Sequence, residues 1–180
     1  MKKKLLTTIL LISAIYSNGQ TRIKGQLFDA YGNNGWAEIF LNGEPTKWME
    51  YNGEIDLVST KKGINEITLK YYGHYITKIK IECNKDIIDI GKIYLISGHF
   101  WLDGPKNGTI TSAYNNGKVK YKINIKNWTS HGESKFYNSS GKLTQKLFFK
   151  RGRLLKVQVR ENETFKELKF ELTKKGEILT

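Results

Sequence analysis

The chain has 180 residues, a formal net charge of +13 and a single cysteine. This length allows one or two small domains. One cysteine excludes an intramolecular disulfide, so hydrophobic burial must hold the fold, and Cys83 is expected to be buried.

Residues 1–19 are predicted to be a signal peptide. Three lysines at positions 2–4 precede an apolar run from Leu5 to Tyr16, and small residues precede the expected cleavage at Gly19-Gln20. The run has about 12 residues, whereas a membrane-spanning helix needs about 20. We therefore expect an exported protein, in the periplasm, at the outer surface or secreted, with no transmembrane segment in the mature chain.

The charge is unevenly divided along the mature chain. Residues 20–97 hold 10 basic and 10 acidic residues, whereas residues 98–180 hold 17 basic and 7 acidic ones. Such a change in composition, together with the Gly and Pro around residues 98–108, predicts a domain boundary there.

Residues 20–97 show the alternation of half-buried strands. Ala37, Ile39 and Leu41 share one face, and glycine or Asn-Gly turns follow at strand-length intervals. This pattern predicts an all-β fold, a seven-stranded, Greek-key-like sandwich.

The same stretch resembles the carboxypeptidase regulatory-like domain, a transthyretin-like sandwich. The resemblance rests on turn and core positions: Gly25, Asp29, Gly32, Ala37, Ile39, Gly53 and Tyr72 to Tyr75. It implies an accessory module that carries no chemistry of its own.

Residues 98–180 contain four similar phrases: "YNNGKV", "YNSSGKL", "FKRGRL" and "LTKKGEI". Their glycines, at positions 117, 141, 152 and 176, are each expected to take positive φ in a hairpin turn. Between the turns, apolar and polar residues alternate, as in Val119 to Ile125 and Leu155 to Val159. The pattern predicts an antiparallel hairpin-repeat sheet with one apolar face and one cationic face.

This half resembles the bacterial MORN-like hairpin repeats of proteins labelled as antitoxins. Two copies align, with Gly108 and Gly117-Lys118 in the first, and Gly132-Glu133 and Gly141-Lys142 in the second. The resemblance implies an open antiparallel sheet. An intracellular antitoxin role conflicts with the predicted signal peptide.

The sequence offers no catalytic or cofactor motif. His74, His99 and His131 are far apart, Asp86 and Asp89 are read as solvated carboxylates, and no phosphate-binding loop occurs. We expect a non-enzymatic protein without a cofactor or metal.

The remaining candidate is the cationic face, which we expect to bind an anionic envelope polymer, such as a polysaccharide or lipid phosphate, through charge. The residues assigned to it are Lys118, Lys120, Lys122, Trp128, Tyr137, Lys146, Lys150, Arg151, Arg153, Lys156 and Arg160. Export argues against nucleic acid as the partner. The alternative is an immunity-type or structural protein that recognises one protein partner through the sheet, in which the lysines only preserve solubility.

Overall fold

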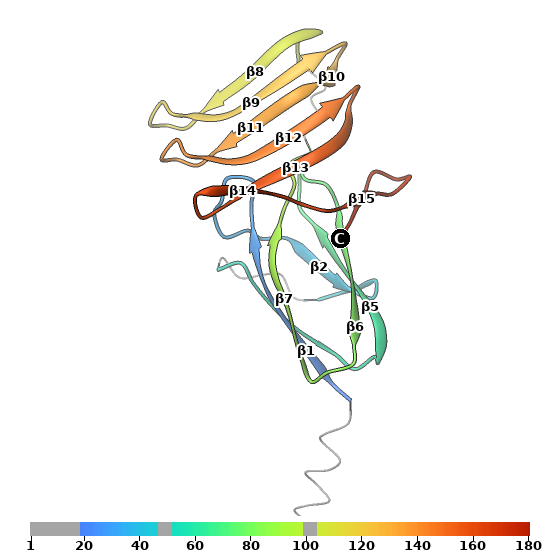
Figure 1. Cartoon of the computed structure of the whole chain (residues 1–180). Coiled ribbons are helices and arrows are strands. Elements are labelled where there is room, and N and C mark those ends of the chain that lie inside the picture. The colour runs from blue at the N-terminus through green and yellow to red at the C-terminus, as the bar shows by residue number, and fades with distance from the viewer. Residues whose placement is uncertain (1–18, 47–51, 99–103) are drawn as a thin grey trace, which may run out of the picture.

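The computed structural model describes residues 19–46, 52–98 and 104–180, which are all-β. Their strands form three sheets (Figure 1). Apart from Gly19, the predicted signal peptide lies outside the described residues, as do His99 and the centre of the predicted boundary segment. The described segments include no helix long and apolar enough to cross a membrane.

The N-terminal half forms the predicted two-sheet sandwich. Its seven strands are β1 (Thr21–Phe28), β2 (Glu38–Leu41), β3 (Glu44–Pro45), β4 (Glu54–Ser59), β5 (Gly63–Lys70), β6 (Thr77–Cys83) and β7 (Ile87–Tyr94). One sheet has the order β4-β1-β7, with β7 parallel to β1, and the other contains β6-β5-β2-β3. Ile23, Leu27, Ile67 and Leu69 are completely buried between them, and Cys83 is buried as expected.

The C-terminal half forms a seven-stranded antiparallel sheet, which we call the repeat sheet. Its strands are β8 (Asn107–Ala113), β9 (Val119–Lys126), β10 (Thr129–Ser130), β11 (Gly132–Tyr137), β12 (Leu143–Lys150), β13 (Arg153–Glu161) and β14 (Thr164–Glu167). They are ordered β8-β9-β11-β12-β13-β14, with β10 beside the end of β9. The four predicted turn glycines all have positive φ, between 76° and 84°.

The last hairpin departs from the prediction. The strands β15 (Glu171–Leu172) and β16 (Ile178–Leu179) surround the fourth glycine turn, but they do not extend the repeat sheet. Instead, β16 pairs in parallel with β6, where Ile178 lies opposite Thr77. The end of the chain therefore returns to the sandwich, as Figure 1 shows.

The two halves share a hydrophobic core. Ala30 and Ile96 of the sandwich are buried in the same cluster as Phe136, Leu147 and Val157 of the repeat sheet. Hydrogen bonds cross the junction as well: Thr144 Oγ1 donates to the Ala30 carbonyl (2.8 Å), and Gln145 Nε2 donates to the Leu95 carbonyl (3.3 Å). The repeat sheet thus lies over one end of the sandwich, with β8 farthest from it (Figure 1).

Candidate anion-binding site

The strand register separates the two faces of the repeat sheet. Lys135 of β11 lies opposite both Lys122 of β9 and Lys146 of β12. The next residue on each strand, namely Ile123, Phe136 and Leu147, is buried against the sandwich. Because side chains alternate along a strand, the three lysines form a row on the outer face.

Lys120 is an exception to the predicted cationic face. Ala113 pairs with Val119 and Ser112 with Tyr121, so Lys120 is the extra residue of a β-bulge. Its ammonium lies 5.0 Å from the centre of the Tyr31 ring, a residue of the shared core. The bulge interrupts the alternation that the sequence suggested, and Lys120 contacts the N-terminal half instead of joining the outer row.

Several outer-face cations have acidic or aromatic partners. Lys135 pairs with Glu133 (2.8 Å), and Lys156 pairs with Glu167 (2.5 Å). The Lys146 ammonium lies 4.4 Å from the centre of the Phe165 ring. Lys122 makes no such contact with the described residues, but the face as a whole is less cationic than its lysine count suggests.

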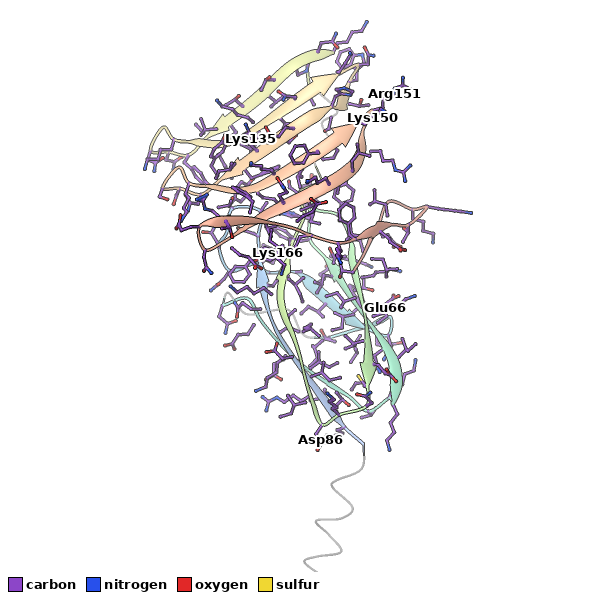
Figure 2. The ribbon with its side chains drawn as sticks, in the orientation of Figure 1. Glu66, Asp86, Lys135, Lys150, Arg151 and Lys166 are labelled. Atoms are coloured by element: carbon purple, nitrogen blue, oxygen red, sulfur yellow. The ribbon has the colours of Figure 1, made fainter. Side chains whose placement is uncertain are left out.

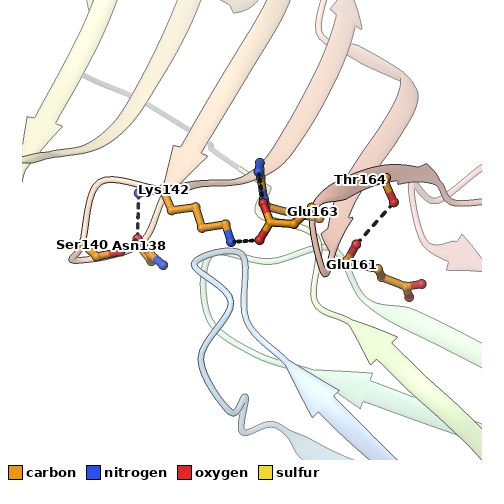
Figure 3. A network of polar contacts seen from close by, with 7 residues as sticks. Asn138, Ser140, Lys142, Glu161, Glu163 and Thr164 are labelled. Atoms are coloured by element: carbon orange, nitrogen blue, oxygen red, sulfur yellow. Dashed lines mark hydrogen bonds and ion pairs between the residues drawn. The ribbon is translucent and has the colours of Figure 1, made fainter.

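One end of the repeat sheet is extensively paired (Figure 3). Glu163 bridges Lys142 (2.8 Å) and Arg160 (3.3 Å), and the hydrogen bond from Lys142 is the largest cause of a lowered pKa of Glu163. Lys118 donates to the Ser140 carbonyl across the neighbouring turns (2.8 Å). The Tyr114 hydroxyl donates a hydrogen bond to the Tyr137 carbonyl.

The opposite end holds cations that lack such partners. Lys150, Arg151 and Arg153 surround the turn between β12 and β13, and Figure 2 shows Lys150 and Arg151 at this end of the sheet. The turn is joined to its neighbour because Gly152 N donates to the Ser130 carbonyl (2.9 Å). Lys126 lies at the adjacent end of β9, and Trp128 N donates to the Lys106 carbonyl (3.0 Å).

The final hairpin adds two more cations. Lys174 and Lys175 of the β15–β16 turn line a cleft of about 520 Å³ together with Arg153, Gly152 and Tyr75. The sequence predicts a turn at these two lysines, but nothing in it places residue 174 next to residue 153. Lys106, Lys126 and Lys135 are not among the predicted residues either, because they lie outside the clearest alternating segments.

We call this group the cationic end; its members are Lys106, Lys126, Trp128, Lys150, Arg151, Arg153, Lys174 and Lys175. All eight are exposed, and no described carboxylate lies within ion-pairing distance of any of the seven cations. An excess of like charges that are not ion-paired creates a positive potential that attracts anions.

The backbone at the cationic end is also unusual. Trp128 has φ of 64° and Arg151 has φ of 51°, a region that bulky residues rarely occupy. The Trp128 side chain is 62% exposed. Both residues lie in two-residue hairpin turns, between β9 and β10 and between β12 and β13, where positive φ matches the twist of the strands.

The described residues contain no group of three or more His, Cys, Asp or Glu side chains arranged to hold a metal ion. His74 contacts Tyr71, with 4.8 Å between the ring centres, and its Nδ1 contacts the Tyr72 carbonyl. His131 Nδ1 accepts the Arg151 N–H at 3.4 Å. Both rings thus have local structural roles.

The model of the MORN repeat variant family matches residues 106–127 and 130–151. The first match contains β8 and β9, and the second contains β11 and β12, so each repeat holds one strand–turn–strand hairpin. No curated protein and no solved structure matches the chain. The MORN-like repeat predicted from the paired glycines is thereby confirmed for residues 106–151.

Proposed function

We propose that this protein is an exported, non-enzymatic binding protein whose cationic end holds an anionic envelope component, either an acidic polysaccharide or a lipid phosphate. The observation that supports this proposal best is the contrast between the two ends of the repeat sheet. Lys142 and Arg160 at one end are paired with Glu163, whereas the seven exposed cations at the other end form no ion pair with a described carboxylate.

In this proposal, the sandwich is a carboxypeptidase regulatory-like accessory module, and the signal peptide directs the chain out of the cytoplasm. The sandwich supports the site structurally, because β6 holds β16 and thereby positions the turn that carries Lys174 and Lys175. Trp128 would stack on a sugar ring or insert at a lipid headgroup, as exposed aromatic residues with one polar edge do.

The test compares two charge-reversal triples in the mature chain. K150E/R151E/R153E changes the cationic end, and K61E/K62E/K85E makes the same change in net charge on exposed lysines of the sandwich. Binding to polygalacturonate and to phosphatidylglycerol vesicles is measured by titration at 50 and 500 mM salt. We expect the first triple to weaken binding by about tenfold or more, and the second to have a much smaller effect.

High salt should weaken binding by the unmodified chain, because the screening length is about 10 Å at 0.1 M salt and shorter above it. If both triples lost the same affinity, binding would depend only on net charge and the proposal of a site at the cationic end would be wrong. Binding that does not depend on salt, or the absence of binding, would also overturn the proposal.

A protein partner is the second candidate, and strand β8 is the observation that favours it. Among the described strands β8 pairs with β9 alone, and no charged residue occurs in Asn107–Ala113. Natural edge strands usually carry charges that prevent pairing, so an uncharged edge can accept a strand from a partner. Under this alternative, partner binding survives K150E/R151E/R153E and is lost when Thr111 is replaced by proline.

A further inference from the structure

An apolar groove opens on the sandwich beside the segment that leads into the final hairpin. It lies between the neighbouring edges of β6 and β7, one from each sheet, and has a volume of about 360 Å³. Its apolar lining consists of Ile79, Ile90, Ile93, Ile96, Leu168, Phe170 and Ile178. This volume is in the range of pockets that hold small ligands, about 300 to 1,000 Å³.

The topology explains why the groove stays open. Strand β16 covers the edge of β6 at Thr77 and Lys78 and reaches no further. Beyond that point, Ile79 of β6 and Ile90 of β7 face the gap between the sheets, while the chain around Leu168 and Phe170 passes over one end. Figure 1 shows this segment crossing the sandwich on its way from β14 to β15.

The polar residues that line the groove are three lysines together with Thr77, Tyr94 and Thr180. Lys80, Lys92 and Lys169 line it from three different segments, and all three are exposed. None of them forms an ion pair with a described carboxylate; Lys92 lies 6.0 Å from the centre of the Phe28 ring. Long lysine side chains can lie along an apolar wall and place their ammonium groups at its mouth.

An apolar groove bordered by lysines is complementary to a molecule with an apolar chain and an anionic head. We infer that the groove binds a single acyl chain that carries an anionic head, with the chain between the isoleucines and the head against Lys80, Lys92 and Lys169. The inference goes beyond the proposed function, because the groove shares no lining residue with the cationic end and offers mainly apolar contacts.

The test uses cis-parinaric acid, a fluorescent fatty acid, with the mature chain at 50 mM salt. Saturable binding at one site is expected. The variant K80E/K92E/K169E should weaken it by about tenfold or more, because each reversal places a carboxylate beside the anionic head. The sandwich triple K61E/K62E/K85E matches its change in net charge and should leave the affinity within about threefold.

The lining is tested by Phe170→Glu, which places a charge in the groove and should abolish binding. If this variant unfolds, K80E/K92E/K169E still tests the inference, because its three side chains are exposed and their replacement should not disturb the core. Displacement by lysophosphatidylglycerol and by dodecanoate then shows whether phosphate or carboxylate heads bind more tightly.

The inference is overturned if no saturable binding occurs, if K80E/K92E/K169E binds as tightly as the unmodified chain, or if uncharged dodecanol competes as well as dodecanoate. K150E/R151E/R153E should retain fatty-acid binding, so a failure of the cationic-end proposal and a failure of this one give different results.

Discussion

At the scale of single residues, two glycines with the same backbone conformation have different surroundings. Gly53 has φ of +72°, and a Cβ added there would lie 2.6 Å from the Leu27 carbonyl oxygen. Gly43 has φ of +88°, and nothing lies within 4 Å of its added Cβ. Gly43 is needed only for the conformation of its turn, whereas Gly53 also allows two backbone segments to approach closely.

We therefore expect Gly43→Ala to lower the free energy of unfolding by about 1 kcal/mol, the cost of a left-handed alanine. Gly53→Ala should cost about 3 kcal/mol or more, because the clash adds to the same conformational cost. Urea denaturation of both variants measures the difference. Equal losses would mean that the chain near Leu27 relaxes freely.

His74 gives the fold a dependence on pH. Burial lowers its pKa below the usual 6.5, and its Nε2 atom is buried without a hydrogen-bond partner among the described residues. Around pH 6.5 the unfolded chain protonates His74 more readily than the folded chain does, so stability falls as the pH decreases from about 7.

We therefore expect a lower urea midpoint at pH 5.5 than at pH 7.5, because protonation of His74 favours the unfolded chain. His74→Gln should remove this part of the pH dependence. The urea midpoints of both proteins are measured at the two pH values. If the midpoint of the variant changed as much between them as that of the unmodified chain, other groups would cause the effect.

At the scale of elements, the glycine turns were predictable and the partner of the last hairpin was not. The turns at 114–118, 138–142 and 173–177 share one hydrogen-bond pattern, in which Gly117, Gly141 and Gly176 donate to the carbonyl three residues earlier. That geometry is local, so the phrases alone predict it. The pairing of Ile178 with Thr77 joins residues about 100 positions apart through a two-residue strand, which leaves no periodic signal.

In the candidate site as well, local features were predictable and tertiary contacts were not. The alternation correctly predicted that Lys122 and Lys146 lie on the outer face, because side-chain direction along a strand is a local property. It failed at Lys120, where a bulge depends on the neighbouring strand. The Glu163 network and the approach of Lys174 to Arg153 depend on tertiary structure and appear only in the folded chain.

Strand β16 is predicted to contribute much of the stability of this region. Ile178 is completely buried in the core that the two halves share, whereas its neighbour Leu179 is partly exposed. Ile178→Ala should reduce the free energy of unfolding by about 2 to 5 kcal/mol through lost burial and a cavity. Leu179→Ala is the matched control and should cost well under half as much; similar costs would indicate that β16 is loosely attached.

At the scale of the whole molecule, the charge boundary near residue 98 does not mark two independent bodies. Ala30, Ile96, Phe136, Leu147 and Val157 are each at most 1% exposed, and they come from both sides of that boundary. Separating the halves would expose these side chains to water, at about 1.5 to 3 kcal/mol for each large one. The chain therefore divides in composition but packs as one unit.

This packing predicts that residues 20–180 unfold in a single transition. Trp36 lies in the sandwich and Trp128 in the repeat sheet, so variants that keep one of the four tryptophans and replace the others by phenylalanine report on each half separately. Their fluorescence midpoints in urea should coincide, as a two-state transition requires. Adding Ile178→Ala to each variant should lower both midpoints together, because Ile178 belongs to the shared core. If Trp128 instead reported unfolding at a clearly lower urea concentration than Trp36, the repeat sheet would be a separate folding unit that merely rests on the sandwich.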